Sequence, residues 1–216
     1  MDFIGAYSPD NLMFLVDGFW ITLKVAAISI VLSFIIGGIL GILRYADIPV
    51  VSKIVAGMIE VIRNLPLLLI IFFVYFALPE IGIKFSIEAS AIIALTVFES
   101  AMLAEIIRSG LNSVPKGQIE AGRSSGLSYI QTLWHIVLPQ GIKKMVPPIV
   151  SQFISLLKDT SLATVIALPD LMHNAQVLNA QSINYIVPIF ILVALMYFVV
   201  NYILSIVTRR LELKAS

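Results

Sequence analysis

The sequence predicts an all-α membrane protein with five transmembrane helices in a single domain, residues 1–216. Hydrophobic residues make up 59% of the chain and charged residues only 12%, whereas a soluble domain carries about 25% charged residues. A spanning helix requires about 20 mostly apolar residues, and five stretches meet this requirement. The predicted spans are residues 18–43, 51–78, 87–107, 146–168 and 185–207.

The distribution of Lys and Arg predicts the orientation of these spans, because cytoplasmic segments carry more basic residues than outer segments. If the N-terminus is outside, Lys84 is the one basic residue in the outer segments, and the acidic tail with Asp2 and Asp10 is also outside. The basic residues of the cytoplasmic segments are then Arg44, Lys53, Arg108, Lys116, Arg123, Lys143, Lys144, Arg209, Arg210 and Lys214. The sequence therefore predicts an outer N-terminus and a cytoplasmic C-terminus.

Several classes of function are excluded by what the sequence lacks. The net charge of +1 gives no reason to expect nucleic acid as a partner, and the absence of cysteine excludes disulfides and thiolate metal sites. His135 and His173 fall on opposite sides of the membrane in this topology, so no metal site is expected. The chain has no phosphate-binding loop and no nucleophile–base arrangement. We therefore expect neither an enzyme nor a bound cofactor.

The first span contains a motif for close helix packing. Gly37 and Gly41 form a G-x-x-x-G pattern, which lets two helices approach closely; the alternative is a flexible point in the helix. Lys24 lies near the outer end of this span, where we expect its ammonium group to reach the lipid headgroups.

The second span begins with a polar group of residues. Glu60 and Arg63 are three residues apart and share a helix face, so they can form an ion pair. Asn64 follows, and Pro66 removes one helical hydrogen bond, which favours a bend. Two interpretations remain open: a bent gating helix with Glu60, Arg63 and Pro66 on its cytoplasmic side, or a static charged pair at the membrane interface.

The third span carries a carboxylate near its middle. Glu99 and its neighbour Ser100 lie deep in the predicted span, whereas Glu105 and Arg108 lie near its cytoplasmic end and are expected to pair. A charge at mid-membrane costs about 2.5–3.5 kcal/mol on insertion scales, and such residues usually face a bundle interior or a wet cavity. Glu99 facing a pathway would attract a cationic ligand. Alternatively, Glu99 is protonated or pairs with Lys158.

The fourth span is interrupted by the polar run Lys158-Asp159-Thr160-Ser161. Such an interruption is tolerated at membrane depth only where protein or a water-filled cavity covers it. Lys158 can meet a substrate carboxylate, and Thr160 or Ser161 can donate hydrogen bonds. The alternative is that Lys158 and Asp159 neutralise charges on neighbouring helices.

The polar segment of residues 113–140 predicts two short helices beside the membrane. Pro115 can open the first helix, and Gly126 can end it in the left-handed conformation. Ser128 and Gln131 form a capping box for the second helix, which we expect to stop at Pro139.

This segment also resembles a known family. The pattern Glu-Ala, then Gly126, then Ile-x-Leu-Pro resembles the EAA loop of permease subunits in bacterial ATP-binding-cassette importers, with Gly122 in place of the usual second alanine. The strings Glu-x-x-Arg-x-x-Pro-Leu from Glu60 and Lys-Asp-Thr-Ser-Leu from Lys158 are similar to the polar amino-acid permeases of that family. The residues that the resemblance implies for coupling to an ATPase are Glu120, Ala121, Gly122, Gly126, Leu127, Ile136, Leu138 and Pro139.

The resemblance implies an importer of polar amino acids in a bacterial cell membrane, working by alternating access. Its implied partners are two copies of an ATPase subunit that hold ATP and Mg²⁺, an external solute-binding protein and a second permease chain, expected to make a homodimer. Because Glu99 adds a carboxylate, we expect a basic amino acid: arginine, lysine or histidine. The residues expected to bind substrate are Asn64, Glu99, Ser100, Lys158, Asp159, Thr160 and Ser161.

Two functions are alternatives to an importer subunit. A secondary carrier or a channel would need no ATPase, but such carriers often show internal repeats with paired broken helices. Here the fourth span is clearly interrupted and no repeat mirrors it. A membrane enzyme is the third possibility, and no catalytic set of residues supports it.

Overall fold

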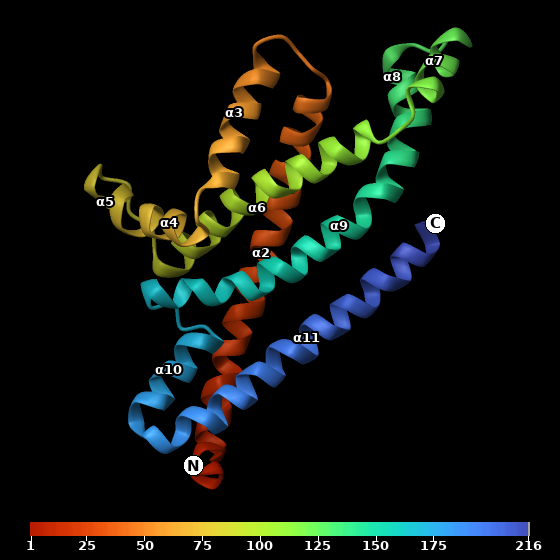
Figure 1. Ribbon diagram of the computed structural model, residues 1–216. Helices are drawn as coiled ribbons and strands as arrows, with labels where there is room; N and C mark the ends of the chain where they lie inside the picture. Colours follow the sequence, from red (N-terminus) through yellow and green to blue (C-terminus); the bar gives the residue numbers. More distant parts are fainter. Residues whose placement is uncertain (216) are drawn as a thin grey trace.

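The computed structural model describes the backbone of residues 1–215 and the side chains of residues 1–206, 209 and 210. Lys214, which entered the orientation argument, lies outside the described side chains. Helices account for nearly all of the chain (Figure 1). The elements are α1 (Phe3–Ala6), α2 (Pro9–Tyr45), α3 (Val51–Asn64), α4 (Leu67–Phe72), η1 (Phe73–Ala77), α5 (Leu78–Glu80), α6 (Ile87–Asn112), α7 (Lys116–Ser124), α8 (Tyr129–Thr132), η2 (Leu133–Val137), α9 (Leu138–Asp159), η3 (Thr160–Ile166), α10 (Leu171–Gln181), η4 (Ile183–Tyr185) and α11 (Ile186–Ala215).

Within the described residues, four helical runs are long and apolar enough to cross a membrane, and a bent pair of helices makes a fifth span if it is counted as one. The predicted all-α membrane fold is therefore confirmed. The observed helices differ from the predicted spans at their ends: α2 begins at Pro9, and the helical run that contains α9 extends from Tyr129 to Ile166.

Helices α2 and α6 form the centre of the bundle, where they cross one another (Figure 1). A Cβ atom on Gly37 would lie 2.8 Å from the Ser100 carbonyl oxygen, and one on Gly41 would lie 2.8 Å from the Ala104 carbonyl oxygen. The backbones touch at these two glycines, so the packing interpretation of G-x-x-x-G is confirmed.

The second span is broken rather than gently bent. Helices α3 and α4–α5 meet at an angle of 102°, and Leu65 and Pro66 between them are extended. Pro66 has no N–H to donate, and its ring disfavours a helical conformation at Leu65. Figure 1 shows α4 and α5 turned away from the axis of α3. The bend predicted from Pro66 is confirmed, and it separates two helices.

The prediction that Pro139 ends a helix is wrong. Helix α9 continues through Pro139, directly after the π-helical turn η2. In that turn the Leu138 N–H donates to the Leu133 carbonyl oxygen, five residues back. The backbone hydrogen bonds have therefore changed from the i→i−4 to the i→i−5 pattern just before the proline. The same sequence of a π-helical turn followed by Leu-Pro occurs at η1 and Pro79. At both places a π-helical turn directly precedes the proline.

Candidate functional site

The coupling segment, residues 113–140, protrudes at the end of the bundle where α6 stops and α9 begins (Figure 1). Pro115 precedes α7, and Gly126 after it has φ +88°, which favours glycine. Ser128 and Gln131 make both hydrogen bonds of the capping box at the start of α8. The first predicted short helix and the glycine that ends it are confirmed. The second is not a separate short helix, because α8 continues through η2 into α9 as one run from Tyr129 to Ile166.

Coupling residues fall into an outer and an inner group. Glu120, Ala121, Gly126 and Pro139 are exposed, whereas Leu127, Ile136 and Leu138 are half-buried and Gly122 is buried. The terminal methyl group of Ile136 occupies the space that a Cβ atom on Gly122 would need. The glycine that departs from the usual alanine thus accommodates Ile136. Of the exposed residues, Glu120 and Ala121 lie on α7 and Gly126 lies in the turn after it.

The carboxylate of Glu105 is the centre of a charged network. Arg108, on the same helix, contacts it at 2.5 Å, and Arg44 of α2 donates a short hydrogen bond to it. Arg63 of α3 lies 4.0 Å from the same carboxylate. The predicted Glu105–Arg108 pair is confirmed. The expected Glu60–Arg63 pair is not among the ion pairs of the described residues, because Arg63 turns toward Glu105 instead.

A polar cavity of ≈ 410 Å³ lies beside this network, between α3 and α6; we call it the α3–α6 cavity. Its polar lining residues come from α2, α3 and α6. They are Arg44, Glu60, Arg63, Asn64 and Glu105. The cavity therefore brings together Glu60 and Arg63 of the predicted gating helix, but not Pro66, with Asn64, one of the predicted substrate-binding residues.

Glu99 is buried within the bundle, with 1% of its surface exposed. Gln152 of α9 donates a hydrogen bond of 3.2 Å to Glu99 Oε2, while Oε1 has no partner among the described residues. Ser100 donates to the Thr96 carbonyl oxygen of its own helix. The expected alternative pairing of Glu99 with Lys158 is absent among the described ion pairs. The partner of Glu99 is Gln152 instead, which the sequence analysis did not identify. The available signal in the sequence was that Gln152 is a single amide side chain in an apolar stretch.

The polar run at the end of α9 is only partly turned toward Glu99. Asp159 is half-buried, whereas Lys158 is exposed. The Thr160 and Ser161 hydroxyls donate to the carbonyl oxygens of Leu157 and Lys158. The helix changes from α to 3₁₀ at this point, as the predicted interruption implied. The predicted substrate-binding residues thus do not form one site. Glu99 is buried within the bundle, whereas Asn64 lines the α3–α6 cavity.

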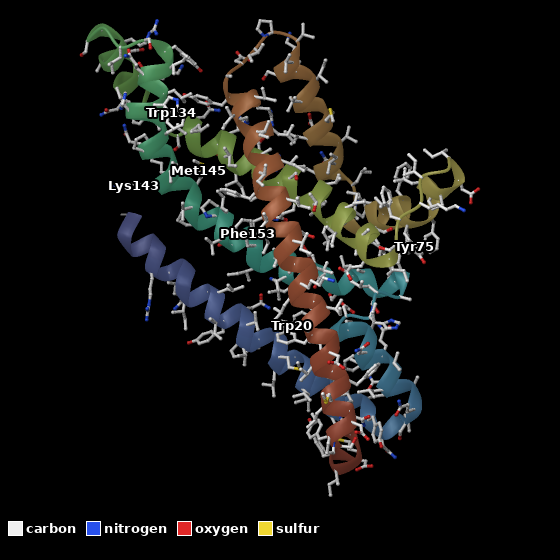
Figure 2. The ribbon with its side chains drawn as sticks, turned by 180° about the vertical axis from the view of Figure 1, so that it is seen from behind. Trp20, Tyr75, Trp134, Lys143, Met145 and Phe153 are labelled. Carbon is white, nitrogen blue, oxygen red and sulfur yellow. The ribbon has the colours of Figure 1, made fainter. Side chains whose placement is uncertain are left out.

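Lys24 has a protein partner that the sequence did not predict. Its Nζ atom lies 2.7 Å from the carboxylate of Glu88, at the start of α6. Figure 2 shows the chain from behind, with Trp134 on η2 and Lys143, Met145 and Phe153 along α9; Met145 is buried. Among the described residues, no group of acidic residues, histidines or cysteines could hold a metal ion.

A family profile described as "Binding-protein-dependent transport system inner membrane component" matches residues 33–216. The chain belongs to this family. Its members named below are permease subunits of ATP-binding-cassette transporters, so the chain is a multi-pass transport subunit and not an enzyme.

Two curated relatives come from Bacillus subtilis (strain 168). The probable glutamine ABC transporter permease protein GlnP is 69% identical over 216 residues, which is 99% of each chain. The probable glutamine ABC transporter permease protein GlnM is 40% identical over 203 residues, 94% of each chain. Among solved structures, a chain from an amino acid ABC transporter with histidines has a TM-score of 0.92 at 28% identity and covers 99% of both chains. The chain is therefore an amino-acid permease of the binding-protein-dependent family.

Proposed function

We propose that this permease carries glutamine, or a neutral polar amino acid very like it, through the membrane in an ATP-driven importer. The observation that carries the proposal is the 69% identity, along the whole chain, with a permease named for glutamine. This proposal replaces the basic amino acid that Glu99 indicated in the sequence. Because Glu99 is buried and bonded to Gln152, its charge is not presented on a surface where it would select a cation.

We propose that the coupling segment binds the ATPase subunit on the cytoplasmic side. Its exposed residues Glu120, Ala121 and Gly126 support this assignment, since small residues allow close approach of another backbone. ATP and Mg²⁺ belong to that ATPase, of which we expect two copies. A solute-binding protein would deliver the amino acid at the opposite face, near α10. Transport then follows from alternating access, in which each state binds substrate with a different affinity.

The second permease chain has two candidates. A second copy of this chain would provide two identical coupling segments, as the sequence led us to expect. A related but different permease is the other candidate, because two permeases named for glutamine in one organism both resemble this chain. Co-expression of this chain carrying two different affinity tags distinguishes them: joint purification supports the homodimer.

Proteoliposomes test the proposed function directly. The complete complex, with the ATPase inside and the solute-binding protein outside, should take up radiolabelled glutamine only when ATP is enclosed. An excess of unlabelled arginine should leave this uptake nearly unchanged. Active uptake with the ATPase subunit omitted would support the rival carrier, and competition by arginine as strong as by glutamine would restore the basic specificity.

A further inference from the structure

An apolar groove of ≈ 590 Å³ lies between α2, α6 and α9; we call it the α2–α9 groove. Every residue that lines it is apolar or glycine. Ile39 of α2 and Ile142 of α9 are exposed in this chain, and nothing lies within 4 Å of the Cβ position of Gly38, which also lines the groove. The chain by itself therefore leaves room for an apolar occupant.

The length of the groove corresponds to one leaflet of a bilayer. Its lining residues on α9 extend from Leu138 to Val150, which is about 18 Å at the rise of an α-helix. At the inner end the rings of Phe34 and Phe153 pack against each other, with their centroids 6.3 Å apart. One leaflet contributes about 15 Å to the hydrocarbon core. A lipid acyl chain matches this length, whereas a spanning helix of a second protein copy is about twice as long.

A cation without a protein partner stands at the edge of the groove. Lys143 precedes Val146 by three residues and Val150 by seven, and both valines line the groove, so the three residues share one edge of α9. Lys143 is exposed and makes no ion pair among the described residues. Helical side chains lean toward the helix N-terminus, which for α9 is the end at the coupling segment. The ammonium group is therefore directed toward that end of the groove.

An aromatic ring marks the same end. Trp134 is exposed on η2, four residues before Leu138, and tryptophan is enriched at the level of the lipid headgroups. Figure 2 shows Trp134 nearest the coupling segment, Lys143 next and Phe153 deeper in the bundle. Ring, cation and apolar groove thus follow one another in the order of the interface, headgroup and acyl chain of a phospholipid.

We propose that the α2–α9 groove binds an anionic phospholipid of the leaflet on the side of the coupling segment. One acyl chain fills the groove, where burial of apolar surface provides the affinity. The phosphate group lies at Lys143, because a basic side chain at the membrane surface attracts an anionic headgroup. A phospholipid whose headgroup also carries a positive group gains less from Lys143. The lipid contacts α2, α6 and α9 together, at the place where α9 leaves the coupling segment.

Photocrosslinking tests the site in the purified permease–ATPase complex, reconstituted in nanodiscs. The probe is phosphatidylglycerol with a photoreactive diazirine in one acyl chain, and peptide mass spectrometry locates the adducts. We expect adducts concentrated on groove residues such as Ile39 and Ile142. Unlabelled phosphatidylglycerol should compete about fivefold better than phosphatidylcholine, which is the advantage expected from one lysine near the surface.

Gly38→Leu tests the apolar part of the site, because the new side chain would occupy the groove. It should reduce the groove adducts about tenfold. The matched control is Ala27→Leu, at an exposed position of the same helix outside the groove, and it should leave these adducts unchanged. Elution of each variant as an intact complex with the ATPase shows that it has folded.

Lys143→Gln tests the headgroup part of the site. This variant should retain groove adducts but lose the preference for phosphatidylglycerol over phosphatidylcholine. Lys53→Gln, which removes an exposed cation of α3 outside the groove, should keep the preference.

Three results would overturn the proposal. Adducts spread evenly over the exposed helices would show that the groove holds no particular lipid. A groove without adducts in the assembled complex would show that a protein, such as a second copy of this chain, covers it. An unchanged preference for phosphatidylglycerol in Lys143→Gln would remove the assigned headgroup contact.

Discussion

At the scale of single residues, Glu105 connects three helices through one carboxylate. Its partners Arg44, Arg63 and Arg108 belong to α2, α3 and α6. The carboxylate is 21% exposed, so water screens it only in part. Removing its charge would leave neighbouring guanidinium groups to repel one another.

Replacement of Glu105 by glutamine should therefore destabilise the chain by roughly 1–3 kcal/mol, since it removes charged hydrogen bonds from a partly buried site. Glu88→Gln is the matched control, because its pair with Lys24 is more exposed. The control should cost only about 0–1 kcal/mol. Thermal unfolding of both variants in the same detergent compares them, and an equal loss of stability would contradict the central position of Glu105.

Asp170 is the second residue with an unusual environment, and it lies between the fourth and fifth spans. Its Oδ1 atom accepts a hydrogen bond from the His173 N–H at 2.8 Å and caps α10, while Oδ2 has no partner among the described residues. Burial raises the pKa of Asp170 to about 7, although the backbone N–H groups at this cap act in the opposite direction. The folded chain thus favours the protonated carboxyl group.

The raised pKa predicts that stability falls with rising pH. The contribution of protonated Asp170 is fully present below its unfolded pKa, about 3.9, and is lost as the pH rises through about 7. Between pH 6 and pH 9 the loss should be about 1 kcal/mol. Asp170→Asn retains a capping side chain and should remove this part of the pH dependence. Parallel thermal unfolding profiles for the two proteins across this range would contradict the assignment.

The charged residues show where sequence reasoning reaches its limit. The Glu105–Arg108 pair follows from helical spacing alone, and the structure confirms it. The partners from other helices, Arg44 for Glu105 and Gln152 for Glu99, depend on how the helices cross. A single sequence does not specify that crossing. For the same reason, helical spacing predicts a pair between Glu60 and Arg63, whereas the tertiary structure turns Arg63 toward the carboxylate of Glu105.

At the scale of helices, the crossing of α2 and α6 depends on glycine. Gly37→Ala should push the two helices apart, because the new Cβ atom would lie 2.8 Å from a backbone oxygen. Such overpacking typically costs about 1–3 kcal/mol. Gly38→Ala is the matched control, since nothing lies within 4 Å of its Cβ position. Thermal unfolding should give a clearly lower midpoint for Gly37→Ala than for Gly38→Ala. Equal midpoints would show that α2 and α6 can move apart at Gly37 without loss of stability.

Helix boundaries were predicted less well than the helices themselves. Apolar stretches of about 20 residues revealed the spans because a bilayer requires such lengths. The two π-helical turns have no recognised signal in the sequence, so the sequence predicts a helix end at Pro139 where α9 continues. The break at Pro66 was foreseen, but its 102° angle follows from the packing of α4 against α6 and η3. Proline marks the place of a distortion, while the surrounding structure sets its size.

At the scale of the whole molecule, the chain is one subunit of a transport system. The fold class, the membrane location and the family were all predictable, because hydropathy and a few spaced motifs carry them. The substrate was not, since Glu99 in the sequence favoured a basic amino acid, whereas the proposal of glutamine draws on relatives that are named for glutamine. The predicted site residues remain predictions, divided between Glu99 and the α3–α6 cavity.

The most direct test of the account is the accessibility of a single cysteine at Ala121, which is convenient because the chain contains no cysteine of its own. The Ala121→Cys variant is treated with a membrane-impermeant maleimide in intact cells and in inside-out vesicles. We predict no labelling in intact cells, labelling in vesicles stripped of the ATPase, and protection when the ATPase subunit is bound. Labelling from outside the cell, or labelling that the ATPase leaves unchanged, would contradict the proposed coupling.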